Sequence, residues 1–363
     1  MEISRRRVLA FLSAGTGVVV LVACGQQEVS PNGTTAGAEP VARAAVAPAP
    51  TATPEPRVVT VYSGRSENLV GPLMQTVLER TGLDVAVRYG STSEMAATIL
   101  EEGSNSPADL FFAQDAGALG ALAREGMLEP LPSRILSRVP DRFRSPVGEW
   151  VGLSGRARVV VYNTDLVKEG DLPDSILGFT DERWLGRLGW APSNGSFQAF
   201  VTGLRVQLGE EAARDWLHGI LANDPVVFPK NTPIVEAVIT GEIDAGFVNH
   251  YYLMRQLAER PDVPASNYFF TDGDPGALVN VAGAGLLRTS ENKGAAIELI
   301  EFFLRDETQR YFADATFEYP LVDGVAAHGG LPSLAEIETP RIDLSDLEDL
   351  RGTLQLLQDV EAL

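Results

Sequence analysis

Two tyrosines stand side by side in the stretch Asn249-His250-Tyr251-Tyr252. Adjacent side chains point to opposite faces of a strand and about 100° apart on a helix, so two neighbouring phenols rarely serve one core. Where a strand turns into a helix, the backbone bends and adjacent rings can converge. A third tyrosine, Tyr162, ends another predicted strand. The pattern therefore indicates either packing or a set of phenol oxygens that share a ligand.

Three converging phenols would suit a hard, highly charged cation, because oxygen ligands suit hard metals. A free phenol has a pKa of about 10 and stays neutral, whereas a bound cation drives nearby acids to ionise. Ferric iron is the common cation whose charge three phenolates would cancel. Packing stays open as the alternative, since tyrosine is often half-buried with a wet hydroxyl.

The residues around these tyrosines form a series of predicted strands and helices that alternate along the chain. The apolar and β-branched patterns predict strands at 58–62, 84–89, 109–112, 158–162, 188–190, 225–228 and 243–248. They predict helices at 66–82, from 91 or 92, at 116–125, from 196, at 232–241 and at 292–313. This order predicts an α/β fold with a mainly parallel sheet flanked by helices. Ligands bind beyond the carboxyl ends of such strands, where polar segments and tyrosines recur here.

The N-terminus has the pattern of an export signal. Arginines at 5–7 precede an apolar run at 8–23, which is interrupted by small residues and short for a membrane span. We therefore expect a signal peptide at 1–23. The residues before Cys24 resemble a bacterial lipobox, and Ser4-Arg5-Arg6 suits the twin-arginine route. We expect lipid on Cys24 and an extracytoplasmic, membrane-anchored protein.

Composition limits the remaining possibilities. Residues 24–57 are rich in Ala, Pro and Thr, which predicts a disordered tether. The roughly 300 residues that follow are enough for two lobes. Cys24 is the only cysteine, so the mature domain has no disulfide and no thiolate metal site. A net charge of −20 disfavours nucleic acid and anionic lipid as partners.

Five segments carry a resemblance to a known family. VTVYSGRSE, ADLFFAQD, GLSGRARVVVYNTD, SNGSFQAF and VNHYYLMR follow one another in this order. Together they resemble the bacterial periplasmic ferric-ion-binding proteins, the iron receptors of ABC importers. The resemblance implies a two-lobe periplasmic binding protein of type II with a hinged cleft. It places the N-terminal lobe at 58–157 plus about 280–335, the C-terminal lobe at 158–280, and an acidic helical segment at 336–363.

The same resemblance implies that Tyr162, Tyr251 and Tyr252 bind Fe³⁺. Many members also use a histidine and a glutamate from the N-terminal lobe. The matching positions here are Ser66, or Glu67 if the gap shifts, and the neutral Gln114. We therefore expect carbonate or bicarbonate to complete the coordination shell, as in the members that rely on tyrosines alone.

Arg65 and Arg156 are expected to hold that anion, because the arginine fork fits a planar oxyanion. The backbone amides of the helix that starts near Ser196 can assist. The residues expected beside the ligands, rather than on the iron, are Tyr62, Ser66, Gln114, Asn194, Ser196, Asn249 and His250.

The function expected from the sequence is a monomeric receptor that delivers ferric iron to an ABC permease and its ATPase. One alternative keeps the receptor fold but binds an oxyanion such as phosphate or sulfate, or a small organic acid. A hydrolytic enzyme is the remote alternative. The sequence has no G-x-S-x-G elbow, no H-E-x-x-H motif, no Walker loop and only three histidines, so no enzyme is expected.

Overall fold

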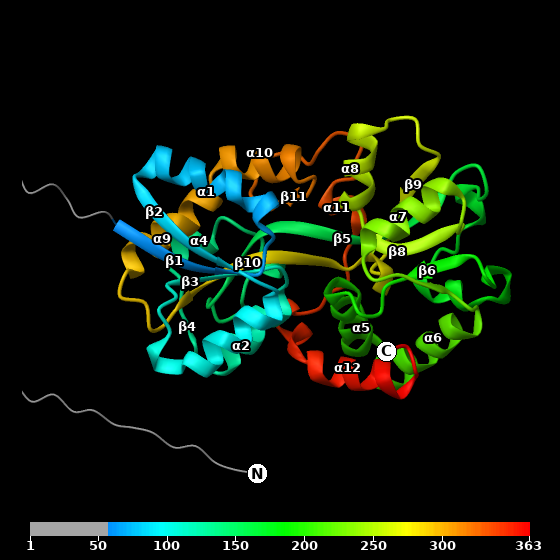
Figure 1. Cartoon of the computed structure of the whole chain (residues 1–363), viewed down its shortest axis with the longest axis horizontal. Coiled ribbons are helices and arrows are strands. Elements are labelled where there is room, and N and C mark those ends of the chain that lie inside the picture. The colour runs from blue at the N-terminus through cyan, green and yellow to red at the C-terminus, as the bar shows by residue number, and fades with distance from the viewer. Residues whose placement is uncertain (1–56) are drawn as a thin grey trace, which may run out of the picture. The chain divides into compact units, whose positions relative to one another are not determined.

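The computed structural model describes residues 57–363 (Figure 1). The predicted signal peptide, the predicted lipidation site Cys24 and the predicted tether lie outside the described residues, apart from Arg57, where the first strand begins. Within 57–363, no helix is long and apolar enough to cross a membrane.

Strands and helices alternate through both halves of this part of the chain. The strands are β1 Arg57–Ser63, β2 Leu83–Tyr89, β3 Leu110–Ala113, β4 Leu128–Glu129, β5 Val151–Asn163, β6 Leu188–Trp190, β7 Val226–Val227, β8 Ala245–Asn249, β9 Ala265–Tyr268, β10 Val279–Leu287 and β11 Tyr319–Pro320. The α-helices are α1 Glu67–Thr81, α2 Thr92–Glu102, α3 Ala116–Arg124, α4 Ser133–Leu136, α5 Gly195–Leu208, α6 Glu210–Ala222, α7 Asn231–Thr240, α8 Tyr251–Glu259, α9 Lys293–Phe303, α10 Asp306–Ala315, α11 Leu334–Ile337 and α12 Leu350–Asp359.

A single mixed sheet runs through both lobes in the order β2-β1-β3-β10-β5-β8-β6-β7. Pairs are parallel in the outer part of each lobe, where β1 joins β2 and β3, and β6 joins β7 and β8. The shared strand β5 makes antiparallel pairs with β10 up to Ala157 and with β8 from Arg158 onward. The predicted two-lobe α/β fold with a mixed sheet is confirmed.

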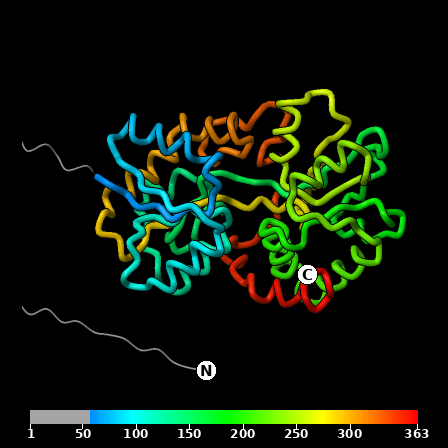
Figure 2. The backbone as a smooth tube through the Cα atoms, viewed as in Figure 1, coloured from blue at the N-terminus to red at the C-terminus, as the bar shows by residue number. Residues whose placement is uncertain are grey.

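The two lobes are connected by long strands (Figure 2). In Figure 1, β1 to β3 with α1, α2, α9 and α10 form the left-hand lobe, and β6, β8 and β9 with α5 to α8 form the right-hand one. Strands β5 and β10 cross between them. A hinge at these crossings would let the lobes move as rigid bodies.

Several predicted boundaries were moved by local chemistry. The predicted helix at 292–313 is two helices, because α9 ends at Phe303 and α10 begins at Asp306. Thr308 Oγ1 donates to the Phe302 carbonyl and Gln309 Nε2 to the Phe303 carbonyl, so side chains satisfy the end of α9. Helix α7 begins at Asn231 and ends at Thr240, each one residue earlier than predicted.

An aromatic cluster holds the second lobe together. The Phe247 ring on β8 lies 5.6 Å from the rings of Phe179 and Trp216, measured between centroids. Edge-to-face contacts of this kind add to the free energy gained from area burial. Packing of Phe247 therefore holds β8, the strand that leads to the Tyr251-Tyr252 pair, in place.

We expect Phe247→Ala to lower the free energy of unfolding by about 3–5 kcal/mol, because it opens a cavity in a fully packed cluster. Urea denaturation followed by circular dichroism measures this change. Val227→Ala on β7 is the control, since Val227 is 65% exposed and surface changes usually stay within about 0.5 kcal/mol. Similar losses in both variants would show that the cluster does not stabilise this lobe.

Candidate ligand-binding site

A cavity of about 880 Å³ lies between the lobes and is lined by both of them. The sequence-predicted residues that line it are Ser66, Gln114, Arg156, Asn194, Ser196 and Asn249. They come from segments that follow β1, β3, β6 and β8 and from the shared strand β5. The structure brings these segments together around one cavity.

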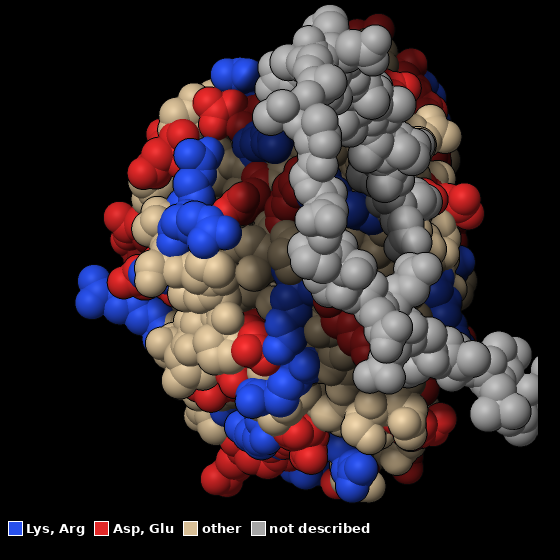
Figure 3. Space-filling view, turned by 90° about the vertical axis from the view of Figure 1, so that its left-hand side faces the viewer, with Lys and Arg blue, Asp and Glu red and all other residues tan. Residues whose placement is uncertain are grey.

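Basic side chains outnumber acidic ones around the cavity. Arg156, Arg158, Lys230 and Arg351 line it, against Asp115 and Glu348. The chain as a whole carries a net charge of −20, and the face seen in Figure 3 mixes acidic and basic side chains. The cleft therefore differs in charge from the protein that surrounds it.

The N-terminus of α5 forms one wall of the cavity. Asn194 Oδ1 accepts hydrogen bonds from the Ser196 amide at 3.0 Å and the Ser196 hydroxyl at 2.7 Å. Asn231 Nδ2 donates to Ser196 Oγ at 3.0 Å, while Asn231 Oδ1 is buried without a partner. The partial positive charge of a helix N-terminus favours an anion at this wall.

The Tyr251-Tyr252 pair lies where the sequence places it, at a strand-to-helix junction. Strand β8 ends at Asn249 and α8 begins at Tyr251. The two rings stack, with centroids 4.3 Å apart and planes 28° apart. Tyr251 is buried and Tyr252 half-buried. Adjacent phenols do converge here, because the first turn of a helix follows directly on a strand.

Burial raises the pKa of the Tyr251 phenol, and a charge on Tyr252 would raise it further. The positive charges of Arg156 and Arg65 act in the opposite direction, while Glu318 adds to the rise. Tyr251 is therefore neutral unless a cation binds its oxygen. Such a cation must displace a proton, so this phenol suits a strongly charged ion better than a weak one.

Arg156 and Arg158 are both buried and both line the cavity. Their Nε atoms have no hydrogen-bond partner, and neither has Arg158 Nη1. Arg158 Nη2 donates to the Phe247 carbonyl, and its guanidinium lies over the rings of Phe197 and Phe200. Burial lowers the pKa of Arg158 to about 9. Buried donors without partners at a cavity wall are suited to bind an anion.

The Arg65 guanidinium is ion-paired inside the protein, although its Nε, like that of Arg156, has no hydrogen-bond partner. Arg65 is 1% exposed and donates from Nη2 to Glu318 Oε1 at 2.5 Å. Ser154 Oγ donates to the other oxygen of Glu318 at 2.6 Å. Burial alone would raise the pKa of Glu318, but the charges of Arg65 and Arg156 and these hydrogen bonds hold it below its usual range. The charge of Arg65 is thus already compensated.

His250 uses both ring nitrogens for backbone contacts. Nδ1 accepts from the Ala157 amide at 3.1 Å, so Nε2 carries the proton and donates to the Phe317 carbonyl at 2.7 Å. Burial lowers the pKa of His250 to about 4. Both ring nitrogens of this neutral imidazole make hydrogen bonds, so neither is left to bind a metal. His250 instead holds the start of α8 in place.

Two of the predicted tyrosines, Tyr162 and Tyr62, lie away from the Tyr251-Tyr252 pair. Tyr162 is buried on β5, on the same face as Val160, in the main core. Helix α8 packs over the opposite face, where Leu253 joins Val159 and Val161. The structure does not bring Tyr162 to the Tyr251-Tyr252 pair. Tyr62 also points away from the pair, because its hydroxyl donates to Glu102 and accepts from Arg88.

Glu318 is the residue that sequence reasoning missed. It lies between α10 and β11 in the stretch Phe317-Glu318-Tyr319, which matches no motif, and its partner Arg65 is 253 positions away. The local sequence offers one sign, a charged residue between two aromatic ones. A charge in this position is unusual because the residues that follow form a buried strand. Among residues 57–363, no group of three His, Cys, Asp or Glu side chains could hold a metal.

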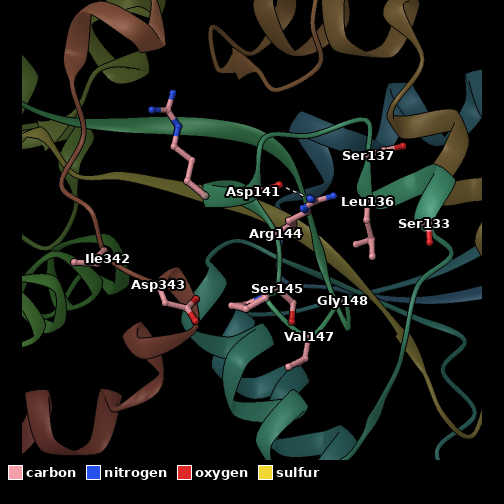
Figure 4. Close-up of a pocket in the computed structure, with 12 residues that line it drawn as sticks. Ser133, Leu136, Ser137, Asp141, Arg144, Ser145, Val147, Gly148, Ile342 and Asp343 are labelled. Carbon is pink, nitrogen blue, oxygen red and sulfur yellow. Dashed lines mark hydrogen bonds and ion pairs between the residues drawn. The ribbon is translucent and has the colours of Figure 1, made fainter.

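A second hollow of about 850 Å³ lies between residues 133–148 and the C-terminal segment at Ile342 and Asp343 (Figure 4). Arg144 forms an ion pair with Asp141 at its edge. None of the residues predicted to bind a ligand lines it. The candidate site is therefore the cleft between the lobes.

Comparison with known proteins gives consistent matches. Residues 105–342 match the family described as bacterial extracellular solute-binding proteins. The chain is 35% identical over 312 residues to the major ferric iron-binding protein of Neisseria meningitidis serogroup B, covering 85% of this chain and 94% of that protein.

Two solved structures resemble the fold closely. Iron-bound HitA from Pseudomonas aeruginosa has a TM-score of 0.79 and 32% identity, covering 84% of this chain and 99% of that one. A Trichodesmium protein, IdiA (FutA), solved with iron and citrate ligands, has a TM-score of 0.74 and 28% identity over the same shares of the two chains.

We expect Glu318→Gln to lower the free energy of unfolding at neutral pH by about 3–5 kcal/mol, because it leaves Arg65 buried and unpaired. The depressed pKa of Glu318 stabilises the fold above the pKa of the unfolded chain, and this contribution is lost as pH falls through the folded-state pKa. Urea titrations at neutral and acidic pH should show a large difference between the proteins at neutral pH and a smaller one in acid.

Glu301→Gln is the matched control. Glu301 pairs with Arg134 at the surface, where the arginine side chain is 64% exposed, so the expected loss is below about 1 kcal/mol. Equal losses for Glu318→Gln and Glu301→Gln would contradict the role given to the buried pair.

Proposed function

Because the chain belongs to the bacterial extracellular solute-binding proteins, and within them to the ferric-ion-binding proteins, we propose that it captures ferric iron between its lobes. In this proposal Tyr251 and Tyr252 bind the metal as phenolates. The protein then delivers it to an ABC permease with its ATPase. The names of the relatives support ferric iron as the ligand, and the stacked phenol pair supplies oxygen atoms that can bind it.

The observation that carries the proposal is this stacked pair beside three buried arginines. Tyr251 and Tyr252 are adjacent at the start of α8. Their charges, when ionised, act on Arg65 and Arg158. Arginines near a phenol favour its ionised form, which is the form that a ferric ion needs. The pair is therefore set to bind a cation only when that cation is strong enough to displace protons.

The charges around the pair require an anion as well. Two phenolates offset two of the three charges on Fe³⁺, and Arg65 is already balanced by Glu318. Arg156 and Arg158, whose charges interact with the tyrosine pair, then leave excess positive charge there. We propose that carbonate or bicarbonate fills this position, held by the free donors of the two arginines and by the amides at the start of α5.

This assignment differs from the sequence-based expectation in two respects. Tyr162 is not proposed as a ligand, because it lies in the core and pairs with Ala245, at the opposite end of β8 from the Tyr251-Tyr252 pair. Arg65 is not proposed to hold the anion, because Glu318 compensates it; Arg158 takes that place beside Arg156. Ser66 and Gln114 line the cleft opposite and can contact a ligand that reaches across it.

Export belongs to the same proposal. The relatives that share the family are extracellular or periplasmic binding proteins. The signal pattern at 1–23 and the lipobox-like Cys24 support a lipid-anchored receptor on the outer face of the cell membrane. The twin-arginine route is proposed from Ser4-Arg5-Arg6, and the protein is proposed to act as a monomer without nucleic acid.

An oxyanion receptor is the second candidate, favoured by one specific observation. Arg156 and Arg158 line the cavity and carry buried donors without a hydrogen-bond partner, and residues at the α5 N-terminus line the same space. Phosphate, sulfate or a small organic acid could bind there without any metal. We propose no enzymatic reaction, because the relatives are binding proteins.

We expect ferric iron with bicarbonate to give the protein a visible phenolate-to-iron absorption band. Tyr251→Phe and Tyr252→Phe should each weaken that band and lower the apparent iron affinity by at least about tenfold, or 1.4 kcal/mol. Tyr162→Phe is the matched control and should leave both unchanged, since the Tyr162 ring lies in the core. A colourless wild-type protein, or a loss of the band in Tyr162→Phe alone, would overturn the assignment.

Calorimetry separates iron from a plain oxyanion as the cargo. In rigorously metal-free buffer we expect phosphate and sulfate to bind weakly or not at all. With iron present, Arg156→Gln should raise the bicarbonate concentration needed for the absorption band by about tenfold, the equivalent of 1.4 kcal/mol. Arg134→Gln, which alters an exposed arginine, is the control. Tight binding of phosphate without metal, unaffected by Tyr251→Phe, would favour the second candidate.

A further inference from the structure

The C-terminal segment crosses from one lobe to the other at the edge of the cleft. Residues 344–353, named here the strap, comprise the short 3₁₀-helix Leu344–Glu348 and the first turn of α12. The strap packs on α3 of the first lobe and on α5 of the second. Figure 1 shows α12 beside α5, at the end of the chain that descends between the lobes.

Two glycines let the strap approach α3 closely. A Cβ atom at Gly120 would lie 2.6 Å from the carbonyl oxygen of Ser345, and one at Gly117 would clash with the carbonyl oxygen of Leu347. Glu348 also forms an ion pair with Arg124 at the end of α3. The strap backbone therefore rests directly on the helix backbone of the first lobe.

Hydrogen bonds fix the next residues of the strap to the second lobe. Arg205 on α5 donates from Nη2 to Asp349 Oδ2 at 2.9 Å and from Nη1 to Thr353 Oγ1 at 3.0 Å. Thr353 Oγ1 lies 2.7 Å from Thr202 Oγ1, and both hydroxyls are buried. The consecutive acids Glu348 and Asp349 are thus paired with arginines of different lobes.

Leu347 joins the two contacts. Its carbonyl oxygen faces Gly117 on α3, and its side chain faces Gly203 on α5. Leu347, Glu348, Leu350 and Arg351 also line the cavity between the lobes. The strap is therefore both a wall of the ligand cleft and a connection between its two sides, separate from the shared strands β5 and β10.

We propose that the strap limits how far α3 and α5 can separate, and so determines how long the cleft keeps its ligand. Opening the lobes would have to break either the close backbone contact with α3 or the hydrogen-bonded contact with α5. The α3 contact should yield first, because packing and the ion pair of one exposed arginine hold it, whereas Arg205 holds the α5 contact with hydrogen bonds to two strap residues. The proposal concerns lobe motion and does not depend on which ligand the cleft binds.

Gly117→Ala and Gly120→Ala test this proposal, because each adds one methyl group between the strap and α3. We expect small-angle X-ray scattering of the ligand-free, full-length variants to show a larger radius of gyration than wild type. We expect transfer of bound ferric iron to excess EDTA to be about tenfold faster, the equivalent of 1.4 kcal/mol. All proteins compared share the same N-terminal residues, so the difference reports on the lobes.

Gly294→Ala is the control, since it adds a methyl group on α9 where no atom lies within 4 Å; it should match wild type in both measurements. If a glycine variant does not fold, Leu347→Ala removes the side-chain contact of the strap with α5 without adding atoms and should shift both measurements in the same direction. If the folded variants have the wild-type radius of gyration and the wild-type rate of iron release, the proposed role of the strap is wrong. Loss of all iron binding in wild type, with the scattering difference retained, would instead overturn only the proposed cargo.

Discussion

Glu318 carries a charge that has no contact with solvent, and the geometry of the cleft depends on how that charge is neutralised. A buried carboxylate is costly unless charges and donors surround it. Arg65 from the loop after β1 and Ser154 from β5 supply them, so distant segments of chain are fixed at one point. The preceding carbonyl, that of Phe317, accepts from His250 and so ties the start of α8 to the same point. One buried ion pair thereby positions the phenol pair and decides which arginines remain free for a ligand.

Sequence patterns located the elements well because periodicity and capping are local. The junction between β8 and α8 follows from an apolar run that ends at a polar dipeptide, and the stacked tyrosines follow from that junction. Tyr162 shows where such reasoning stops. It ends a strand as expected, yet alternation along β5 directs its ring to the face opposite α8. The side of a sheet on which a later helix packs is a property of the chain's topology, which no local pattern contains.

Arg65 and Glu318 show a second limit of the sequence. Arg65 was expected to hold the anion from the loop after a strand, but in the structure it pairs with a carboxylate 253 positions away. Arg158, which was not expected to bind the anion, has more buried donors without a partner than Arg156 has. Residue type and spacing predict which groups reach a site. Only the pairing among those groups decides which of them keep unsatisfied hydrogen bonds, and that pairing requires the folded structure.

The shared strand β5 has a consequence for how the cleft responds to a ligand. Arg156 is on the part of β5 that pairs with β10, Arg158 is on the part that pairs with β8, and only Ala157 separates them. Rotation of one lobe against the other therefore changes the distance between the two guanidinium groups through a few backbone torsions. His250 brackets Ala157 from both its amide and its carbonyl, which narrows the torsions available. An anion bonded to both arginines would fix the distance between them and therefore the angle between the lobes. Binding the ligand and setting the degree of closure would then be the same event.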